Sequence, residues 1–321
     1  MTVPTVYKST DTSAPVLQGV RGSLISVLTA CLVDGYGSKS AAGWTRPFSN
    51  IAETQAAFRN SGVTGTGFYV AVDESTTTYA YAPSIKTYES MLSEIDGLLP
   101  IATIYNSSAS ISATANTTAR PWVLIATDTW MYLFVYANAT AMPSTKAEVI
   151  TACNYALACF LGDFEKLYPS DGFNFLSASS MAKASAAQAS FGCAGTGVDA
   201  IPATNYMFLA RNLAGDTGSV ATINMLSAPH GCSLNYAYGG TYTMPYTDGV
   251  TPLLFAKLQI SAGTTYSLRG FMPGVLAPLT KHPYTNLQQV TVDTEDYIYV
   301  MWRTGYGSED FLAGLLFRLS A

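Results

Sequence analysis

Residues 23–44 decide how the fold begins, and they read Ser-Leu-Ile-Ser-Val-Leu-Thr-Ala-Cys-Leu-Val-Asp-Gly-Tyr-Gly-Ser-Lys-Ser-Ala-Ala-Gly-Trp. Apolar residues recur there at the spacing of one helical face, at Leu24, Val27, Leu28, Cys31 and Leu32. Ser23 is a favourable N-cap, because its hydroxyl can accept a hydrogen bond from an otherwise unpaired backbone N–H. Gly35 can adopt the left-handed conformation that ends many helices. The stretch therefore predicts an amphipathic helix that ends at Asp34 and Gly35.

The loop that follows, residues 35–40, contains glycines and a Lys-Ser pair, as a phosphate-binding loop does. Phosphate-binding loops place Gly directly before Lys and open a helix whose N–H groups point at the phosphate. Here Ser38 separates Gly37 from Lys39, and the loop follows a helix C-terminus, whose dipole repels anions. We interpret the loop as a helix-terminating turn.

Composition predicts a protein whose surface meets other chains. Of the 321 residues, 49% are apolar and only 12% are charged, whereas an average soluble domain carries about 25% charged residues. A surface with so few charges is weakly solvated, and interfaces are depleted in charge and rich in aromatic residues. Small residues flank Tyr36 and Trp44, and a Tyr-rich segment spans 236–246. The predicted interface residues are Tyr36, Lys39, Trp44, Tyr236, Tyr238 and Tyr242.

Charge and hydropathy argue against several classes of partner. The net charge of −5 and the absence of a basic stripe disfavour nucleic acid. No stretch approaches the ~18 apolar residues of a membrane-spanning helix, and residues 1–5 lack the features of a signal peptide. The five cysteines are irregularly spaced, so we expect reduced, buried thiols and folding in a cytosol.

Runs of β-branched and aromatic residues predict most of the remaining elements as strands. The first group is a hairpin of 68–72 with 77–81, a third strand over 84–91, and a loop or weak strand within 97–119. The strongest pair is 121–125 with 130–136, where four alternating aromatic residues favour a packed sheet face. Later strands are expected at 253–260, 264–269, 297–303 and 311–319.

Two stretches are less regular. In 145–161, Thr145 and Glu148 have the spacing of a capping box, which favours a short helix followed by a strand. Residues 177–190 are of low complexity, and their composition allows a weak helix. The fold class predicted is α+β but mainly β, with antiparallel sheets in a sandwich-like or barrel-like arrangement. Two regions, 1–176 and 177–321, are separated only by the low-complexity stretch and can form one continuous domain.

Candidate chemistry is sparse. His230 and Cys232 are too close in a turn for a nucleophile–base pair, and no spacing fits a zinc site. The cluster at Asp293, Glu295 and Asp296 lacks the pattern of a calcium-binding loop and is interpreted as a solvated turn. A glycosidase pair at Asp163 and Glu165 remains an alternative, although nothing in the sequence fixes the separation of the two carboxylates. We predict no catalytic residue, no metal and no cofactor.

Several segments resemble tailed-bacteriophage virion structural proteins. They are Val6–Asp11, Ala14–Leu17, Cys31–Lys39, Ala42–Trp44, Ala119–Trp122, Gly162–Phe164 and Arg269–Gly274. The resemblance implies a non-enzymatic component of the virion, such as a capsid decoration protein or a neck or tail protein. Its partners would be copies of itself and other virion proteins, with no nucleic acid and no membrane. Two alternatives stay open: a receptor- or glycan-binding module of a phage tail, and a polysaccharide hydrolase that uses acidic residues.

Overall fold

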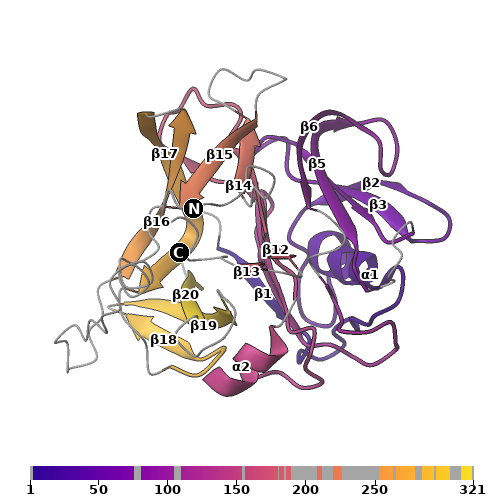
Figure 1. Cartoon of the computed structure of the whole chain (residues 1–321). Helices are drawn as coiled ribbons and strands as arrows, with labels where there is room; N and C mark the ends of the chain where they lie inside the picture. The colour runs from indigo at the N-terminus through magenta and orange to yellow at the C-terminus, as the bar shows by residue number, and fades with distance from the viewer. Residues whose placement is uncertain are drawn as a thin grey trace.

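The computed structural model describes residues 3–75, 81–104, 110–153, 156–179, 181–183, 186–188, 208–211, 220–225, 253–262, 265–278, 284–292, 294–303 and 312–319. These residues form three antiparallel sheets, two short α-helices and one π-helical turn (Figure 1). The protein is therefore mainly β with antiparallel sheets, as the sequence predicts.

The largest sheet has thirteen strands among the described residues. Its hydrogen-bonded order is β1 (Thr5–Lys8), β7 (Trp122–Ala126), β8 (Trp130–Val135), β9 (Ala158–Asp163), β11 (Phe175–Ser179), β14 (Phe208–Arg211), β15 (Val220–Met225), β16 (Leu253–Ala262), β17 (Thr265–Pro278), β20 (Leu312–Arg318), β19 (Glu295–Arg303) and β18 (Gln289–Val292). A thirteenth strand, β10 (Glu165–Lys166), pairs with β17 outside this path. Strand β11 spans residues 176 and 177, so the sheet is continuous across that position.

The large sheet folds back on itself. Strand β8 is not hydrogen-bonded to β19 or β20, yet the rings of Tyr132 and Phe317 lie 4.8 Å apart between their centroids. The rings of Phe134 and Trp302 lie 5.8 Å apart. These contacts form a core between two faces of one sheet, which is a sandwich-like packing. The aromatic face predicted for 130–136 is confirmed, because the four residues are buried there.

The first helix fills the space beside this core. It consists of α1 (Ser23–Thr29) and the π-helical turn η1 (Ala30–Asp34), and Gly35 follows with a φ of 78°. The helix and its end at Asp34 and Gly35 are as predicted. It differs from an amphipathic helix in being buried almost all round, since only Ser26 and Asp34 are exposed. Helices of this kind belong to the interior of a fold.

The start of α1 corrects one detail of the prediction. Gly22, with a φ of 80°, takes the N-cap position, and no side chain within the helix start caps it. The Ser23 hydroxyl instead accepts a hydrogen bond from the backbone N–H of Gln18 at 2.7 Å. The sequence rule missed this because Ser23 is used to hold the preceding loop.

A second sheet has five strands in the order β2 (Thr45–Ser49), β3 (Gln55–Arg59), β4 (Tyr69–Asp73), β5 (Ser84–Met91) and β6 (Gly97–Ile104). It lies beside the large sheet, on the right in Figure 1, with β6 next to β14. Strand β4 pairs with β5, in the register Asp73 to Ser84. The strand predicted at 84–91 is confirmed; for the hairpin, residues 76–80 lie outside the described part.

Helix α2 (Lys146–Ala152) has the predicted capping box and precedes β9, so the interpretation of 145–161 is confirmed. The strands predicted near the C-terminal end are confirmed as β16, β17, β19 and β20. The weak helix allowed within 177–190 is wrong for the described residues. There β11 is followed by a two-stranded sheet of β12 (Met181–Lys183) and β13 (Ala186–Gln188).

Candidate functional site

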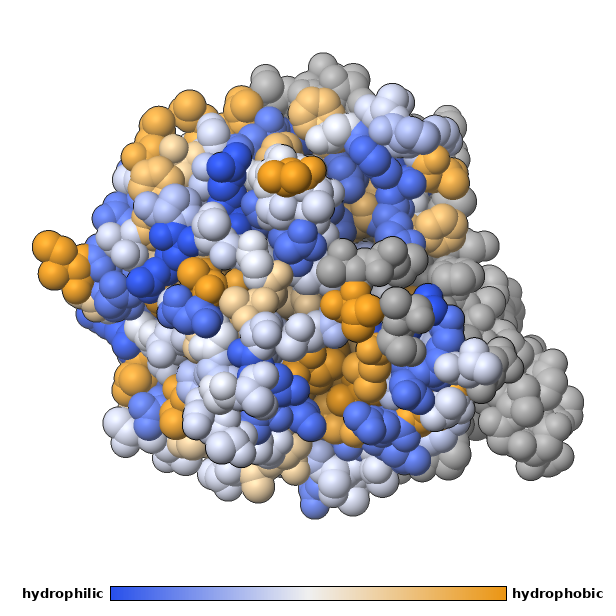
Figure 2. All heavy atoms as spheres, turned by 180° about the vertical axis from the view of Figure 1, so that it is seen from behind, coloured by the Kyte–Doolittle hydropathy of each residue, from blue (hydrophilic) through white to orange (hydrophobic). Residues whose placement is uncertain are grey.

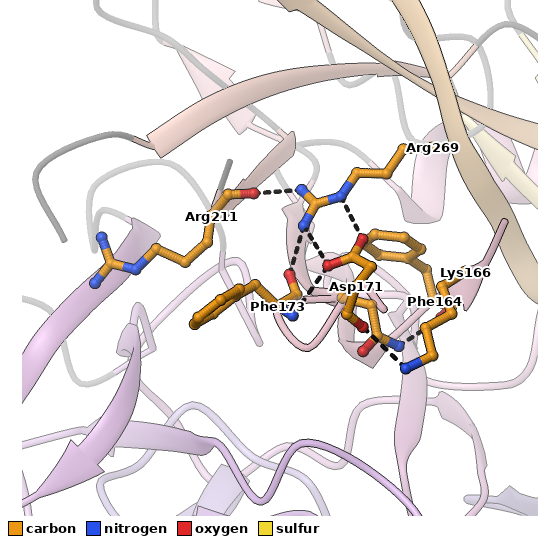
Figure 3. A network of polar contacts seen from close by, with 7 residues as sticks. Phe164, Lys166, Asp171, Phe173, Arg211 and Arg269 are labelled. Atoms are coloured by element: carbon orange, nitrogen blue, oxygen red, sulfur yellow. Dashed lines mark hydrogen bonds and ion pairs between the residues drawn. The ribbon is translucent and has the colours of Figure 1, made fainter. Parts of the chain in front are cut away.

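A buried network of charged side chains connects the two large sheets. Arg269 on β17 donates two hydrogen bonds to Asp171, from Nε at 2.8 Å and from Nη2 at 3.0 Å, and neither side chain is exposed (Figure 3). Arg269 also donates to the backbone carbonyl oxygens of Phe173 and Arg211. A bidentate pair of this kind fixes orientation as well as distance. The network therefore holds the loop 167–174 against β14 and β17.

Aromatic packing and a glycine complete the support of Arg269. Its guanidinium carbon lies 5.1 Å from the centroid of the Phe164 ring, a cation–π distance. Gly270 lies so close to the backbone of Glu165 and to the Phe164 ring that an added Cβ would clash with both. The segments 162–164 and 269–274, far apart in sequence, thus meet in one packed unit that pairs β10 with β17.

The network continues into the five-stranded sheet. Arg211 on β14 forms a salt bridge with Glu89 on β5, and the Arg211 side chain is almost fully buried. Glu89 lies between Tyr88, which pairs with Pro100, and Ser90, which pairs with Leu98. The contacts from Asp171 to Glu89, which pass through the backbone carbonyl and then the side chain of Arg211, therefore connect the β5–β6 hairpin to the loop 167–174.

That hairpin end, residues 92–100, exposes aliphatic side chains and is named here the hairpin tip. Leu92 is 65% exposed, Leu98 50% and Leu99 36%. The turn between them is closed by hydrogen bonds from the backbone N–H groups of Leu92 and Ser93 to the carbonyl oxygen of Asp96, at 2.8 and 3.1 Å. Figure 2 shows hydrophobic side chains at the surface over this end of the sheet, at the upper left. The leucines therefore stand on an ordered turn.

The backbone of the hairpin tip is strained at one residue. Leu99 has a φ of 55°, a left-handed conformation that costs a bulky residue free energy and that the surroundings must impose. It stands beside a β-bulge between β5 and β6. The bulge and Pro100 interrupt the hydrogen-bond ladder of β6 beside the tip.

A second exposed apolar segment is hydrogen-bonded to the same network. Leu167 is 44% exposed and Tyr168 43%, and both follow the exposed Lys166. The Nζ of Lys166 donates to the backbone oxygen of Asp171 at 2.9 Å (Figure 3). The N–H of Leu167 donates to the carbonyl oxygen of Arg269 at 2.8 Å. We name residues 165–168 the Glu165–Tyr168 segment, which carries one acidic and one basic side chain. Its position depends on hydrogen bonds to Asp171 and Arg269 of the buried network.

The hairpin tip carries Glu94 and Asp96 and no basic residue, whereas the Glu165–Tyr168 segment carries one acidic and one basic side chain. Ordered, exposed apolar side chains with charges at their border are suited to contact another protein surface. The site is thus a candidate protein–protein interface.

The predicted interface residues near the first helix, Tyr36 and Lys39, do not belong to this candidate interface. Tyr36 and Lys39 exchange two backbone hydrogen bonds across a tight turn. The Tyr36 hydroxyl donates to Asp11 at 3.0 Å, and its ring packs on Tyr7. Both Tyr36 and Lys39 are half-buried. They hold the N-terminal segment in place and keep only part of their surface for a partner.

The structure corrects the prediction that Trp44 lies at an interface. The sequence places it in an exposed-looking loop, but its side chain is 3% exposed and its Nε1 donates to the carbonyl oxygen of Thr127 at 2.8 Å. Burying the ring and satisfying its N–H stabilise the packing of the helix loop on β7 and β8. Trp44 is therefore a core residue and offers no ring to a partner or a sugar.

Other predicted residues lie outside the described part of the chain. These are the three tyrosines Tyr236, Tyr238 and Tyr242, together with His230, Cys232 and Asp293. Cys31, Cys153 and Cys159 are described, and all three are buried, as predicted.

Asp163, one carboxylate of the alternative glycosidase pair, is held by hydrogen bonds within the chain. It accepts hydrogen bonds from the backbone N–H of Thr66 at 2.7 Å, from the Thr66 hydroxyl at 2.6 Å and from the Asn60 amide at 3.1 Å. Burial raises the pKa of Asp163 to about 6, against the opposing effect of these donors. Asp163 thus fastens the loop 60–66 to β9.

The acidic turn before β19 is also engaged within the chain. Glu295 forms a salt bridge with Arg318 and accepts a hydrogen bond from the Tyr297 hydroxyl at 2.7 Å, and Asp296 accepts one from the Thr291 hydroxyl. Within the described residues, no group of three or more potential ligand side chains is arranged to hold a metal ion.

The site that emerges was missed by sequence reasoning. A signal existed in Gly97–Pro100, where two leucines and a proline follow the acidic turn, but the run was interpreted as a loop or weak strand. Nothing in the sequence pairs Asp171 with Arg269 or Arg211 with Glu89, because these partners are distant in sequence and only the sheet packing brings them together.

Comparison with known proteins adds no relative. The chain matches no family model and no curated protein. Among the described residues, no helix combines the length and the apolar character needed to cross a membrane.

Proposed function

We propose that this chain is a structural subunit of a bacteriophage particle that assembles through contacts between protein surfaces. The observation that carries the proposal is the hairpin tip, where Leu92, Leu98 and Leu99 are exposed on an ordered turn. An ordered turn loses little conformational entropy when a partner covers its exposed leucines.

Composition and resemblance support the same proposal. A chain with 12% charged residues has a weakly solvated surface, and covering much of that surface with neighbouring subunits is favourable. The segments that resemble virion structural proteins also make contacts that build the fold. Tyr36 binds Asp11, and Phe164 packs on Arg269. The resemblance therefore rests on residues that determine the architecture of the subunit, not on a catalytic motif.

The test is the composition of particles. Purified particles of the bacteriophage that encodes this sequence should contain the chain in many copies, as measured by quantitative peptide mass spectrometry after density-gradient purification. Labelling the chain and imaging intact particles would then locate it on capsid, neck or tail. Absence of the chain from purified particles, with its synthesis in infected cells confirmed, contradicts the proposal.

A further inference from the structure

Arg120 differs from the other buried arginines of the described residues in its partners. Arg211 and Arg269 each form a salt bridge with a carboxylate, with Glu89 and Asp171 respectively. Arg120 is only 8% exposed, yet in the described part of the chain no carboxylate forms an ion pair with it. A buried charge is costly unless an opposite charge compensates it. The charge of Arg120 therefore lacks a counter-ion among these residues.

The hydrogen bonds of Arg120 all go to uncharged oxygen atoms. Its Nε donates to the Ser112 hydroxyl at 2.9 Å, its Nη1 to the carbonyl oxygen of Ala139 at 3.3 Å, and its Nη2 to Oδ1 of Asn116 at 3.5 Å. Both Nη contacts are longer than ordinary hydrogen bonds, and a guanidinium has further N–H donors besides these. The Nη edge is thus the side of the group that the chain engages least.

The sequence around this side chain supplies no acid. Arg120 is bonded to residues in three stretches of the chain, 12–20, 97–119 and 129–145, and none of them contains Asp or Glu. The Nη edge also lies near the surface, because the two residues that it contacts are half-buried and residues 117–119 beside them are exposed. A counter-ion from outside the chain can therefore reach this edge.

We infer that the Nη edge of Arg120 binds an oxyanion, a chemistry that phosphate, sulfate and carboxylate groups share. The planar fork of a guanidinium matches two oxygens of such an anion, and the hydrogen bonds formed are charge-assisted. The hydroxyl groups of Thr117 and Thr118, next to Asn116 in the exposed loop, are further donors suited to the same ligand. The site is separate from the hairpin tip, and it does not depend on the proposed assembly function.

The first experiment follows the Nε–H signal of Arg120 in proton–nitrogen NMR correlation spectra, identified by its loss in Arg120→Lys. Sodium phosphate, sulfate and acetate are each titrated at constant ionic strength, with sodium chloride as the reference. Binding should shift the signal until it saturates, with a Kd on the order of 10 mM for one or two charge-assisted bonds. Saturation by phosphate and sulfate identifies a free tetrahedral ion as the ligand, and saturation by acetate identifies an acidic group of a partner. No saturable shift with any of the three overturns the inference.

The second experiment supplies the counter-charge from within the chain. Asn116→Asp places a carboxylate oxygen at the position of Oδ1, which lies 3.5 Å from Nη2 of Arg120. The substitution should raise the midpoint of thermal unfolding by about 2–4 °C, because it compensates a buried charge. It should also weaken phosphate binding by about tenfold, because the internal carboxylate competes with the anion.

The matched control is Asn50→Asp. The Oδ1 of Asn50 accepts from the backbone N–H of Thr54 at 2.9 Å and its Nδ2 donates to the Thr54 hydroxyl at 3.1 Å, but among the described residues it is not hydrogen-bonded to an arginine. This control should leave the phosphate response of Arg120 unchanged. An Asn116→Asp protein that is no more stable than Asn50→Asp, or that is folded and binds phosphate as tightly as the wild type, overturns the inference.

Discussion

Glu74 holds the start of the first helix from a distant part of the sequence. Its carboxylate oxygens accept from the backbone N–H groups of Leu24 at 3.3 Å and Ile25 at 3.1 Å, and its side chain is fully buried. The helix lacks a cap from its own start, because Gly22 occupies that position. Glu74 therefore acts as an N-cap across a sequence separation of 50 residues.

Burial gives this carboxyl group a pH dependence. Desolvation raises the pKa of Glu74 from 4.5 to about 7, against the lowering effect of the backbone donors. The pKa of Glu74 is higher in the folded than in the unfolded protein. The contribution of this carboxyl group to the free energy of unfolding is therefore complete below pH 4.5 and is lost as pH rises through 7. From Glu74 alone, we expect the free energy of unfolding to fall on the order of 3 kcal/mol between about pH 4.5 and about pH 8. Urea unfolding across this range measures it.

The matched variant is Glu74→Gln, which keeps the shape and one acceptor but does not titrate. Its stability should fall less steeply between about pH 5 and about pH 8 than that of the wild type. A residual slope of the same sign should remain, because burial also raises the pKa of Asp163, to about 6. Identical pH profiles for the two proteins would show that Glu74 does not titrate in this window.

At the level of single elements, α2 shows a local cap that the sequence encodes directly. The backbone N–H of Glu148 donates to the Thr145 hydroxyl at 3.3 Å, and the Glu148 carboxylate accepts from the backbone N–H groups of Ser144 and Thr145 at 2.7 and 3.1 Å. These donors lower the pKa of Glu148. Because α2 packs against β19, the cap stabilises both the helix and that contact.

Thr145→Ala should therefore destabilise the protein by about 1 kcal/mol, since one backbone N–H of the first turn loses its acceptor. The control is Thr151→Ala in the same helix, where the side chain is exposed and only bonds back to the carbonyl oxygen of Ala147. This control should change stability little, because alanine favours helix and no cap is lost. Chemical denaturation of both variants gives the comparison, and equal losses would argue against a role of the cap.

At the scale of the whole molecule, the network of Arg269, Asp171, Arg211 and Glu89 joins segments that span most of the chain. Removing one member of a buried pair leaves a charge without compensation in the interior. Arg269→Met should thus destabilise the protein by about 3–5 kcal/mol. The double variant Arg269→Met with Asp171→Asn should be more stable than the single variant, because the uncompensated charge is removed.

Thermal and urea unfolding of the wild type, both single variants and the double variant form a double-mutant cycle. The Asp171→Asn substitution retains a side-chain oxygen that can accept from the backbone N–H of Phe173, a hydrogen bond that Asp171 accepts at 3.0 Å. A double variant whose loss equals the sum of the two single losses would show that the pair contributes no coupling energy.

The elements of this protein were predictable where the local pattern is strong. The strands around Trp130, the capping box at Thr145 and the end of the first helix at Gly35 follow from spacing and residue type, and all are present. Burial of particular aromatic residues was less predictable. Trp44 resembles a loop residue in sequence because its neighbours are small, and its burial depends on the distant carbonyl of Thr127.

By itself, the sequence determined a mainly β, antiparallel protein with few charges and buried thiols, because alternation, propensity and composition act over short ranges. Only the tertiary structure decided which side chains meet across the two sheets: Glu74 with the first helix, Asp171 with Arg269, and Arg211 with Glu89. The same packing left the leucines of the hairpin tip at the surface. Burial of charged pairs and exposure of apolar groups depend on how sheets pack, and no local pattern encodes that geometry.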